Sequence, residues 1–344
     1  MVNILKKLVN AVSVSGAEED VASVIRGLIA DCADEIKTDA LGNLIALKKS
    51  GNNNQNGNAK KFMTAAHMDE IGFIVTFIED NGFLKVNQVG GINWTAVAWG
   101  EILFKNGLRG VIVPENKVNP NDYNSSKFYI DIGAKDKAVA ETKVKIGDTC
   151  TLAPKVIDLM NNRIAATKLD NKIACTVLIK ALLDMKEKGI KPKNDLYFVF
   201  TVQEEVGLRG ARTAAQAIMP DYSIAVDVTG TGDTPECYPM AAKVGGGAAV
   251  KLMDSSVICH KDMVNLLMKT AKAGKIPYQS EILAAGGTDT AVMQSAGAGS
   301  IAGAISIPTR YIHSGVELCS MDDVQACVDL LVAAIDNLTD LQKI

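Results

Sequence analysis

Histidine is scarce in this sequence, and aromatic residues are few. Three histidines occur among 344 residues: His67, His260 and His313. Any chemistry that depends on an imidazole must therefore use one of these three side chains. Aromatic residues make up 5% of the chain, so few flat rings are present on which a sugar could stack.

Long apolar runs, basic blocks and closely spaced cysteine pairs are absent as well. No apolar run approaches the ~20 residues that a membrane-spanning helix needs. The apolar start is interrupted by Lys6, Lys7 and Asn10, so we expect no signal peptide. A net charge of −3 without a basic block argues against nucleic acid as a partner. The seven cysteines are odd in number and never spaced C-x-x-C, which indicates free thiols and a cytoplasmic protein.

Most of the chain alternates between strand-like apolar runs and helical patterns. Strands are expected at residues 42–49, 61–68, 195–202, 222–228 and 299–308, and helices at 171–189, 261–274 and 320–338. Ser320 is the expected cap of the last helix, and Ser15 with Glu18 forms a capping-box pattern before an earlier one. The polar tract 50–60 indicates an exposed hairpin loop. Together these patterns predict a mixed α/β sheet with helices on both faces.

Residues 72–162 follow a different pattern. They contain short strand-like runs separated by turn signals such as Asp80-Asn81-Gly82 and Asn106-Gly107, and no long amphipathic helix. We therefore expect a small all-β domain at 72–162, inserted into an α/β domain formed by residues 1–71 and 163–344.

Polar residues recur where predicted strands end or helices begin. They are His67, Asp69, Asp170, Glu204, Glu205, Asp227 and His313. In open α/β sheets, the carboxyl ends of the strands form the ligand site. Taken singly, each residue has a plain structural explanation, such as a core histidine, a helix cap, a turn residue or a solvated acidic pair. Together these explanations need five coincidences at one sheet edge, so we favour a common site. His260 stands apart from this pattern and is interpreted as structural.

The donor atoms in this set are imidazole nitrogen and carboxylate oxygen, without a thiolate. That combination favours a hydrolytic site for two divalent metal ions, Zn²⁺, Co²⁺ or Mn²⁺, over a structural site. Two such ions carry +4, three carboxylates supply −3, and a bridging hydroxide, the nucleophile of such sites, would balance the charge. Asp170 is the natural bridge between ions ~3.5–4 Å apart.

Glu204 and Glu205 stand side by side after a predicted buried strand. We expect one of them to bind metal and the other to take the proton from the attacking water, and spacing alone does not decide which. Asp69, two residues after His67 on the same face of a strand, is placed to orient the imidazole. A plain turn role for Asp69 also stays open.

Seven ordered motifs extend over nearly the whole chain. They are AHMDEIGF (66–73), KLDNK (168–172), QEEVGLRGA (203–211), AVDVTGTGDTPE (225–236), KVGGGAAVKLMD (243–254), GGTDT (286–290) and SIPTRYIHSGVE (306–317). This series resembles the M42 family of metallo-aminopeptidases, which includes the TET, glutamyl and deblocking aminopeptidases. The resemblance implies a zinc-peptidase-like catalytic α/β domain with an inserted, barrel-like dimerisation domain. It also implies peptide substrates and dimers assembled into a hollow tetrahedral dodecamer.

The resemblance further implies a role for each candidate residue. Asp170 would bridge the two ions, His67 and Asp227 would complete one site, and Glu205 and His313 would complete the other. Glu204 would be the general base, and Asp69 would support a metal ligand. Lys168 and Lys172 stand where Ala and Arg are usual in the family, and Gly315 stands where Pro is frequent. None of these departures falls on an implied ligand.

Two other functions are considered beside removal of N-terminal residues from peptides. Some relatives carry an endoglucanase label, but glycoside hydrolysis needs two acids ~5–9.5 Å apart on either side of the scissile bond. Consecutive residues such as Glu204 and Glu205 at the end of a strand point to opposite sides and are poorly placed for this role. A non-catalytic assembly protein of the same fold is the other alternative, and the complete ligand set argues against it.

The preference for one N-terminal residue is not fixed by the sequence. An enzyme for acidic residues needs a cation in its pocket, and Arg209, Arg310 and Lys243 are candidates by position alone. In the inserted segment, Trp94 and Trp99 could fill the core or, as the resemblance favours, form a subunit interface.

Overall fold

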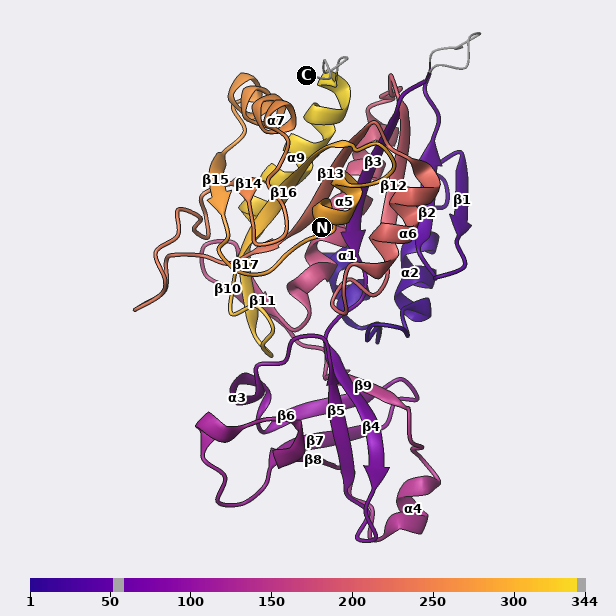
Figure 1. Ribbon diagram of the computed structural model, residues 1–344, viewed down its shortest axis with the longest axis vertical. Helices are drawn as coiled ribbons and strands as arrows, with labels where there is room; N and C mark the ends of the chain where they lie inside the picture. The colour runs from indigo at the N-terminus through magenta and orange to yellow at the C-terminus, as the bar shows by residue number, and fades with distance from the viewer. Residues whose placement is uncertain (52–58, 339–344) are drawn as a thin grey trace.

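The larger part of the molecule is built around an 11-stranded sheet (Figure 1). The computed structural model describes residues 1–51 and 59–338. In order across the sheet, the strands are β1 (Glu35–Thr38), β2 (Leu44–Lys48), β12 (Asp195–Thr201), β3 (Lys61–His67), β13 (Tyr222–Thr229), β16 (Ile301–Arg310), β17 (Glu317–Ser320), β11 (Arg163–Ala166) and β10 (Val156–Leu159). Off this path, β14 (Ala248–Met253) pairs with β16 and with β15 (Tyr278–Ile282).

The four central strands run parallel. β12 pairs with β3, β3 with β13, and β13 with β16 in parallel register. Their side chains alternate between two apolar layers, because successive residues of a strand point to opposite faces. Phe62 belongs to the larger core cluster and its neighbour Met63 to the smaller one. The carboxyl ends of these four strands therefore lie at one edge of a sheet that is buried on both faces.

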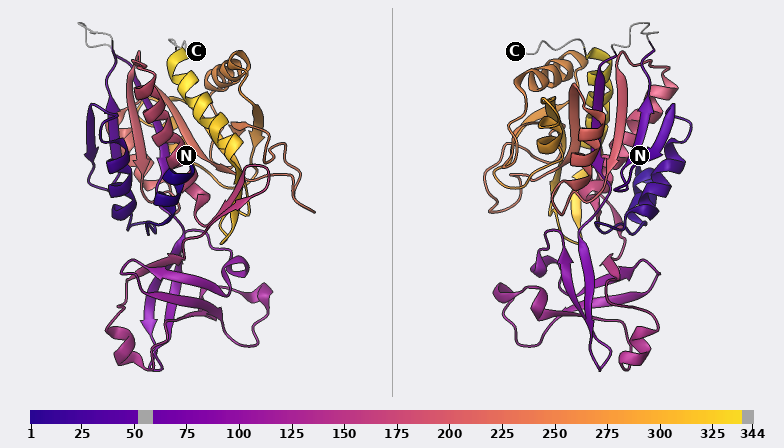
Figure 2. Two further views of the ribbon diagram at one scale, coloured as in Figure 1. Left: turned by 180° about the vertical axis from the view of Figure 1, so that it is seen from behind. Right: turned by 45° about the vertical axis from the view of Figure 1, so that its right-hand side comes forward.

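Helices cover both faces of this sheet. The larger cluster contains apolar residues of α1 (Val2–Val9), α2 (Glu19–Ile29), α5 (Leu169–Glu187), α7 (Lys261–Gly274) and α9 (Met321–Asn337). The smaller cluster joins the opposite face to α6 (Arg209–Ile218) and α8 (Thr290–Gln294). Figure 2 shows α9 lying across the back of the sheet, whereas α6 lies at the front in Figure 1.

The inserted segment forms a closed six-stranded barrel, which is a smaller lobe that lies below the sheet in Figures 1 and 2. Its strands close in the order β4 (Gly72–Ile78), β5 (Leu84–Val89), β8 (Phe128–Asp131), β7 (Arg109–Pro114), β6 (Gly100–Phe104) and β9 (Thr149–Leu152). Short helices α3 (Trp94–Val97), η1 (Pro120–Asp122), η2 (Ser125–Lys127) and α4 (Lys137–Glu141) connect them. Trp94 is buried against Phe73 and Phe128, whereas 69% of Trp99 is exposed.

The predicted fold class is confirmed, with two differences in detail. Ser15 and Glu18 do not form a capping box: Glu18 is the residue before α2 and makes no side-chain cap, while the Ser15 hydroxyl donates to Asp69. Strand β10, within the expected insertion 72–162, pairs with β11 of the large sheet. We therefore propose that the insertion ends between β9 and β10. Residues 52–58 of the expected hairpin loop 50–60 lie outside the described residues.

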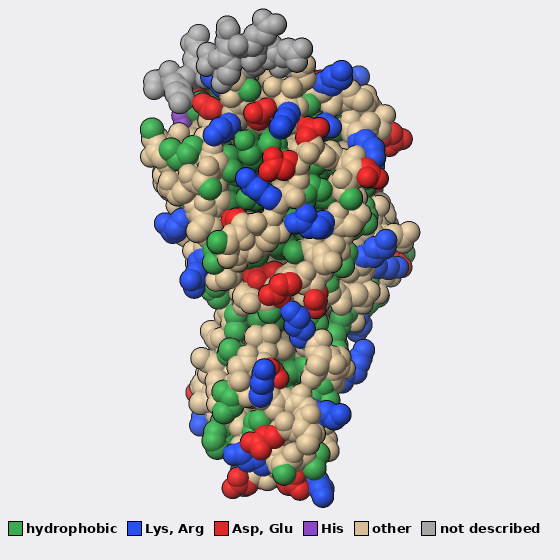
Figure 3. All heavy atoms as spheres, turned by 90° about the vertical axis from the view of Figure 1, so that its right-hand side faces the viewer, with side chains coloured by type: hydrophobic (Ala, Val, Ile, Leu, Met, Phe, Trp, Pro, Cys, Tyr) green, Lys and Arg blue, Asp and Glu red, His purple; other side chains and the backbone are tan. Residues whose placement is uncertain are grey.

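No helix within residues 1–51 and 59–338 is long and apolar enough to cross a membrane. On the face seen in Figure 3, Lys and Arg side chains are interspersed with Asp and Glu over both lobes. That face therefore carries no continuous basic patch of the kind that binds nucleic acid.

Candidate metal centre

The seven predicted residues converge at one edge of the large sheet. His67 is the last residue of β3, and it lies beside Thr201, the last residue of β12. Asp227 lies near the end of β13. Asp69 follows β3, Glu204 and Glu205 follow β12, and His313 follows β16 in the loops beyond those strands, while Asp170 follows β11 at the start of α5. The parallel register of the central strands thus brings together positions that are far apart in the sequence.

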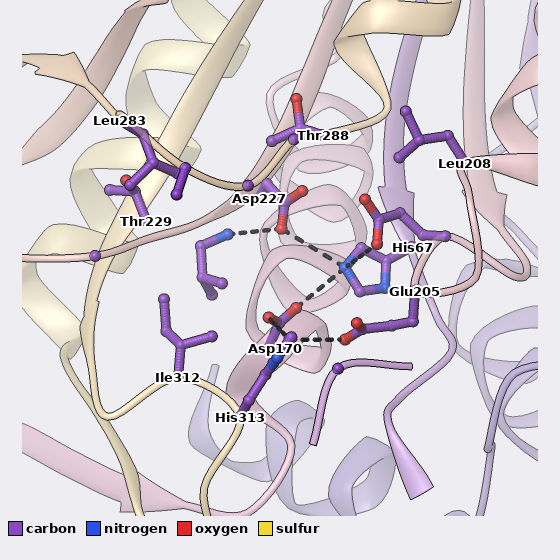
Figure 4. A pocket seen from close by; sticks show the side chains of 17 residues that line it. His67, Asp170, Glu205, Leu208, Asp227, Thr229, Leu283, Thr288, Ile312 and His313 are labelled. Atoms are coloured by element: carbon purple, nitrogen blue, oxygen red, sulfur yellow. Dashed lines mark hydrogen bonds and ion pairs between the residues drawn. The ribbon is translucent and has the colours of Figure 1, made fainter. Parts of the chain in front are cut away.

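Asp170 lies between the two histidines. Its Oδ1 is 3.1 Å from Nε2 of His67, and its Oδ2 is 3.3 Å from Nε2 of His313 (Figure 4). Asp227 approaches the first histidine, with 3.6 Å between its Oδ1 and Nε2 of His67. Glu205 approaches the second, with 3.2 Å between its Oε1 and Nε2 of His313. Two groups result, each with ligand atoms within 4.8 Å of one another, and Asp170 belongs to both.

The two neighbouring glutamates have different surroundings. Glu205 belongs to the second of these groups, with Asp170 and His313. Glu204 belongs to neither group, and its Oε2 lies 3.8 Å from Nε2 of His67. Both line the same cavity above the centre. The geometry therefore leaves Glu204 as a partly buried carboxylate beside the two groups.

Asp69 contacts both an imidazole and a backbone loop. Its Oδ1 is 3.4 Å from Nδ1 of His67 and accepts a hydrogen bond from the backbone N–H of Glu204 at 3.0 Å. Its Oδ2 accepts from the N–H of Glu205 at 3.2 Å and from the hydroxyl of Ser15 at 2.6 Å. Asp69 is fully buried, so these contacts are shielded from water.

The electrostatic field at the centre favours cations. Burial alone lowers the pKa of His67, but Glu204, Asp170 and Asp227 raise it well above its ordinary value. Burial likewise opposes protonation of His313, yet Asp170 and Glu205 raise its pKa to about 11. Burial raises the pKa of Glu204 well above its ordinary value. Several acids packed in one buried place create a negative potential that bound cations would relieve.

The donor set fits a pair of divalent ions. Within the described residues, the buried atoms Oδ1 of Asp170 and Oε1 of Glu205 receive no hydrogen bond. A buried carboxylate oxygen without a partner is costly, and both of these atoms point toward an imidazole nitrogen. Nitrogen and carboxylate oxygen together suit Zn²⁺, Co²⁺ or Mn²⁺. The residues present therefore fit metal binding on chemical grounds.

Two further acids support the centre and have no role in the sequence analysis. Glu317 is buried and accepts hydrogen bonds from the backbone N–H groups of Asp170 and His313, each at 2.8 Å. Asp289 is buried, accepts a hydrogen bond from Thr201 at 2.6 Å, and has its pKa raised to about 7 by burial. Both lie inside the quoted motifs SIPTRYIHSGVE and GGTDT. Burial, which the sequence does not display, is what separates them from ordinary surface acids.

The two lysines beside Asp170 are buried near the centre. Lys172 is fully buried and donates to the hydroxyl of Ser13 and to the carbonyl of Met68. Lys168 is 3.2 Å from Oε1 of Glu70. Both lysines contact the segments next to β3, and neither of them lines the cavity.

Other sequence candidates lie elsewhere. His260 caps α7, since its Nδ1 accepts a hydrogen bond from the N–H of Asp262. Among the described residues that line the cavity, none is Arg209, Arg310 or Lys243. The loop after β5 was missed by the sequence analysis: Gly91 lines the cavity, and a Cβ atom there would lie 3.3 Å from Nδ1 of His313. The inserted barrel thus contributes backbone to the site.

Comparison with known proteins assigns the family. Residues 42–330 match the M42 glutamyl aminopeptidase family. The chain belongs to this family. A protein of Acetivibrio thermocellus is 48% identical over 336 residues, which cover 97% of this chain and 98% of that protein. A lysyl aminopeptidase of Pyrococcus furiosus is 33% identical over 97% of this chain and 96% of its own length.

Several solved structures at 30–33% identity share the whole fold. An aminopeptidase from the archaeon Desulfurococcus kamchatkensis superposes with a TM-score of 0.92 at 33% identity, covering 98% of this chain and 94% of its own. The TET1 peptidase of Pyrococcus horikoshii, which can assemble into a tetrahedron or a large octahedral shell, gives a TM-score of 0.86 at 30% identity, with 98% and 99% covered. A Thermotoga maritima protein described as an endoglucanase gives 0.80 at 32% identity, with 96% of each chain covered. The chain is thus a peptidase of the M42 family.

Proposed function

We propose that the chain is a dinuclear-metal aminopeptidase that removes N-terminal residues from peptides. The observation that supports this proposal is the position of Asp170, whose two carboxylate oxygens each face one of the two histidines. One ion would be held by His67, Asp170 and Asp227, and the other by Asp170, Glu205 and His313. The donor set favours Zn²⁺ or Co²⁺, with Mn²⁺ as a further candidate.

The protein side chains around these ligands would handle the proton. Two divalent ions bound here would polarise the scissile carbonyl and lower the pKa of a water molecule. Glu204, which lies beside the two ligand groups, accepts the proton of the attacking water and passes it to the departing amine. Asp69 keeps His67 oriented and holds the backbone of Glu204 and Glu205 in place. Glu317 fixes the backbone of Asp170 and His313 from the other side.

A chelator experiment tests this function. Prolonged dialysis against a chelator should abolish hydrolysis of amino-acid anilides, and readdition of Zn²⁺, Co²⁺ or Mn²⁺ should restore it. The same preparations should be assayed on a soluble cellulose derivative, because one structural relative is described as an endoglucanase. Cellulose cleavage that survives chelation would reject the aminopeptidase. If the fully metallated protein shows neither activity, a non-catalytic assembly protein is favoured.

We also propose that the chain works as a homo-oligomer in the cytoplasm. The TET1 relative assembles into a tetrahedron, and a dodecamer built from dimers is the corresponding assembly for this chain. The exposed Trp99 on the barrel supports an interface there. All seven cysteines are free, which supports a reducing compartment.

A further inference from the structure

The cavity over the candidate metal centre has two chemically different sides. Its volume is about 560 Å³, within the range of small-ligand pockets. Among the described residues that line it, the charged side chains belong to the ligand set or to Glu204. Figure 4 shows Leu283, Thr229 and Ile312 together on one side of that set. We call these three residues, with Ala285, the apolar wall; all four line the cavity.

A cation that could serve an acidic substrate is already paired near this wall. Arg310 lies two residues before Ile312, but its guanidinium donates to both oxygens of Asp233, at 3.0 and 2.7 Å. This bidentate pair directs two N–H groups of the guanidinium to Asp233, and Arg310 does not line the cavity. The apolar wall therefore presents no free positive charge to a glutamate or aspartate side chain.

The acid behind the wall is paired as well. Glu281 is fully buried and forms an ion pair with Lys251, which is also fully buried. The hydroxyl of Thr229 donates to Glu281 at 2.8 Å and is thus directed behind the wall. Neither charge reaches the cavity, since neither residue lines it. The apolar wall itself therefore offers no acid to a lysine or arginine side chain of a substrate.

These contacts limit which peptide can bind productively. The scissile carbonyl must lie at the ligand set, so the side chain of the N-terminal residue must occupy the remaining volume. Burying a charged group without a partner is far less favourable than burying an apolar one. With two ions bound, the carboxylates of the ligand set would be engaged by the ions, and Glu204 by the attacking water, so none of them would be free to pair with a substrate side chain.

We propose that the apolar wall selects peptides whose N-terminal residue has a neutral, apolar side chain, of the size of leucine or methionine. This inference rests on the aminopeptidase function proposed above and defines its substrate class. It predicts that kcat/KM for leucine or methionine substrates exceeds that for glutamate or lysine substrates by about ten- to a hundredfold.

A panel of anilides tests the inference in the metal-loaded, full-length protein. Leucine, methionine, glutamate and lysine p-nitroanilides are compared by kcat/KM, with and without chelator. Metal-dependent hydrolysis that favours leucine and methionine by tenfold or more supports the inference. Metal-dependent hydrolysis in which glutamate or lysine equals or exceeds leucine overturns it and leaves the aminopeptidase function standing. Failure to hydrolyse any anilide overturns both.

A substitution in the wall locates the specificity. Leu283→Arg supplies a cation at the wall, and Leu283→Gln is the matched uncharged control. The glutamate-to-leucine ratio of kcat/KM should rise about tenfold in Leu283→Arg and not in Leu283→Gln. Equal ratios in the two variants would show that the substrate side chain does not reach this wall. As a readout without turnover, calorimetry with Glu204→Gln should show tighter binding of Leu-Gly than of Glu-Gly or Lys-Gly, and the reverse order would contradict the inference.

Discussion

The backbone N–H of Glu204 donates a hydrogen bond to Oδ1 of Asp69 at 3.0 Å. The same carboxylate accepts from Glu205 and Ser15 and lies 3.4 Å from the imidazole of His67. One buried acid therefore contacts a proposed metal ligand and, at the same time, holds the loop that carries the proposed base. A change that loosens Asp69 should disturb proton transfer without removing any ligand.

Ser15→Ala removes one hydrogen bond to Asp69 and leaves the ligand set intact. A hydrogen bond to a charged group is worth about 1.5–3 kcal/mol, and part of this should appear as a roughly five- to tenfold lower kcat with near-normal metal content. Ser23→Ala, at an exposed position on α2, is the control and should behave as wild type. Elemental analysis and steady-state kinetics on both variants make the comparison. Wild-type kcat in Ser15→Ala would show that the loop does not depend on this contact.

Gly91→Ala tests whether the barrel loop shapes the metal centre. The added Cβ atom would lie 3.3 Å from Nδ1 of His313, so the ring must shift, and small displacements of active-site groups lower rates strongly. We expect about a tenfold loss of kcat/KM and a weaker hold on metal. Gly27→Ala places a Cβ atom in open space on α2 and should change neither quantity. Normal activity and metal retention in Gly91→Ala would show that the barrel loop does not shape the site.

The positions of the proposed ligands could be predicted from the sequence because each one lies near the end of a recognisable strand or begins a helix. His67 is the last residue of β3, and Asp227 lies near the end of β13. The capping-box prediction for Ser15 is wrong, because that pattern is local, whereas its hydrogen-bond partner Asp69 is 54 residues away. Glu317 and Gly91 could not be found, since their roles come from burial and from a loop packed across two lobes. Tertiary contacts of this kind leave no periodic signal in a sequence.

The two tryptophans of the barrel should differ in their effects. Trp94 packs against Phe73 and Phe128 with ring centroids 5.6 and 4.8 Å away, so Trp94→Ala should destabilise the barrel by about 3–5 kcal/mol. Trp99 is 69% exposed, so Trp99→Ala should leave stability within about 0.5 kcal/mol but reduce assembly on a sizing column. A wild-type protein that runs as a 36.5 kDa monomer at micromolar concentration would contradict the proposed interface.

The Asp233–Arg310 pair should make stability depend on pH. The hydrogen bonds from Arg310 lower the pKa of Asp233 to about 2, against about 3.9 in an unfolded chain. The stabilisation is therefore complete above about pH 4 and is lost as pH falls toward 2. Asp233→Asn should lower the free energy of unfolding by about 1 kcal/mol at pH 7, after allowance for solvent screening, and by less at pH 3. Urea unfolding at both pH values checks this, and a difference that does not change with pH would refute the assignment.

The metal content of two single variants tests the central claim, that two ions share Asp170 while Glu204 stays free as the base. Elemental mass spectrometry of wild type, Glu204→Gln and Glu205→Gln, each loaded and desalted in the same way, gives ions per chain. Wild type and Glu204→Gln should hold about two ions, with turnover of Glu204→Gln lower by about 10²–10⁴-fold. Glu205→Gln should hold fewer than wild type, because one charged ligand is lost. Two ions retained in Glu205→Gln together with metal loss in Glu204→Gln would contradict the account.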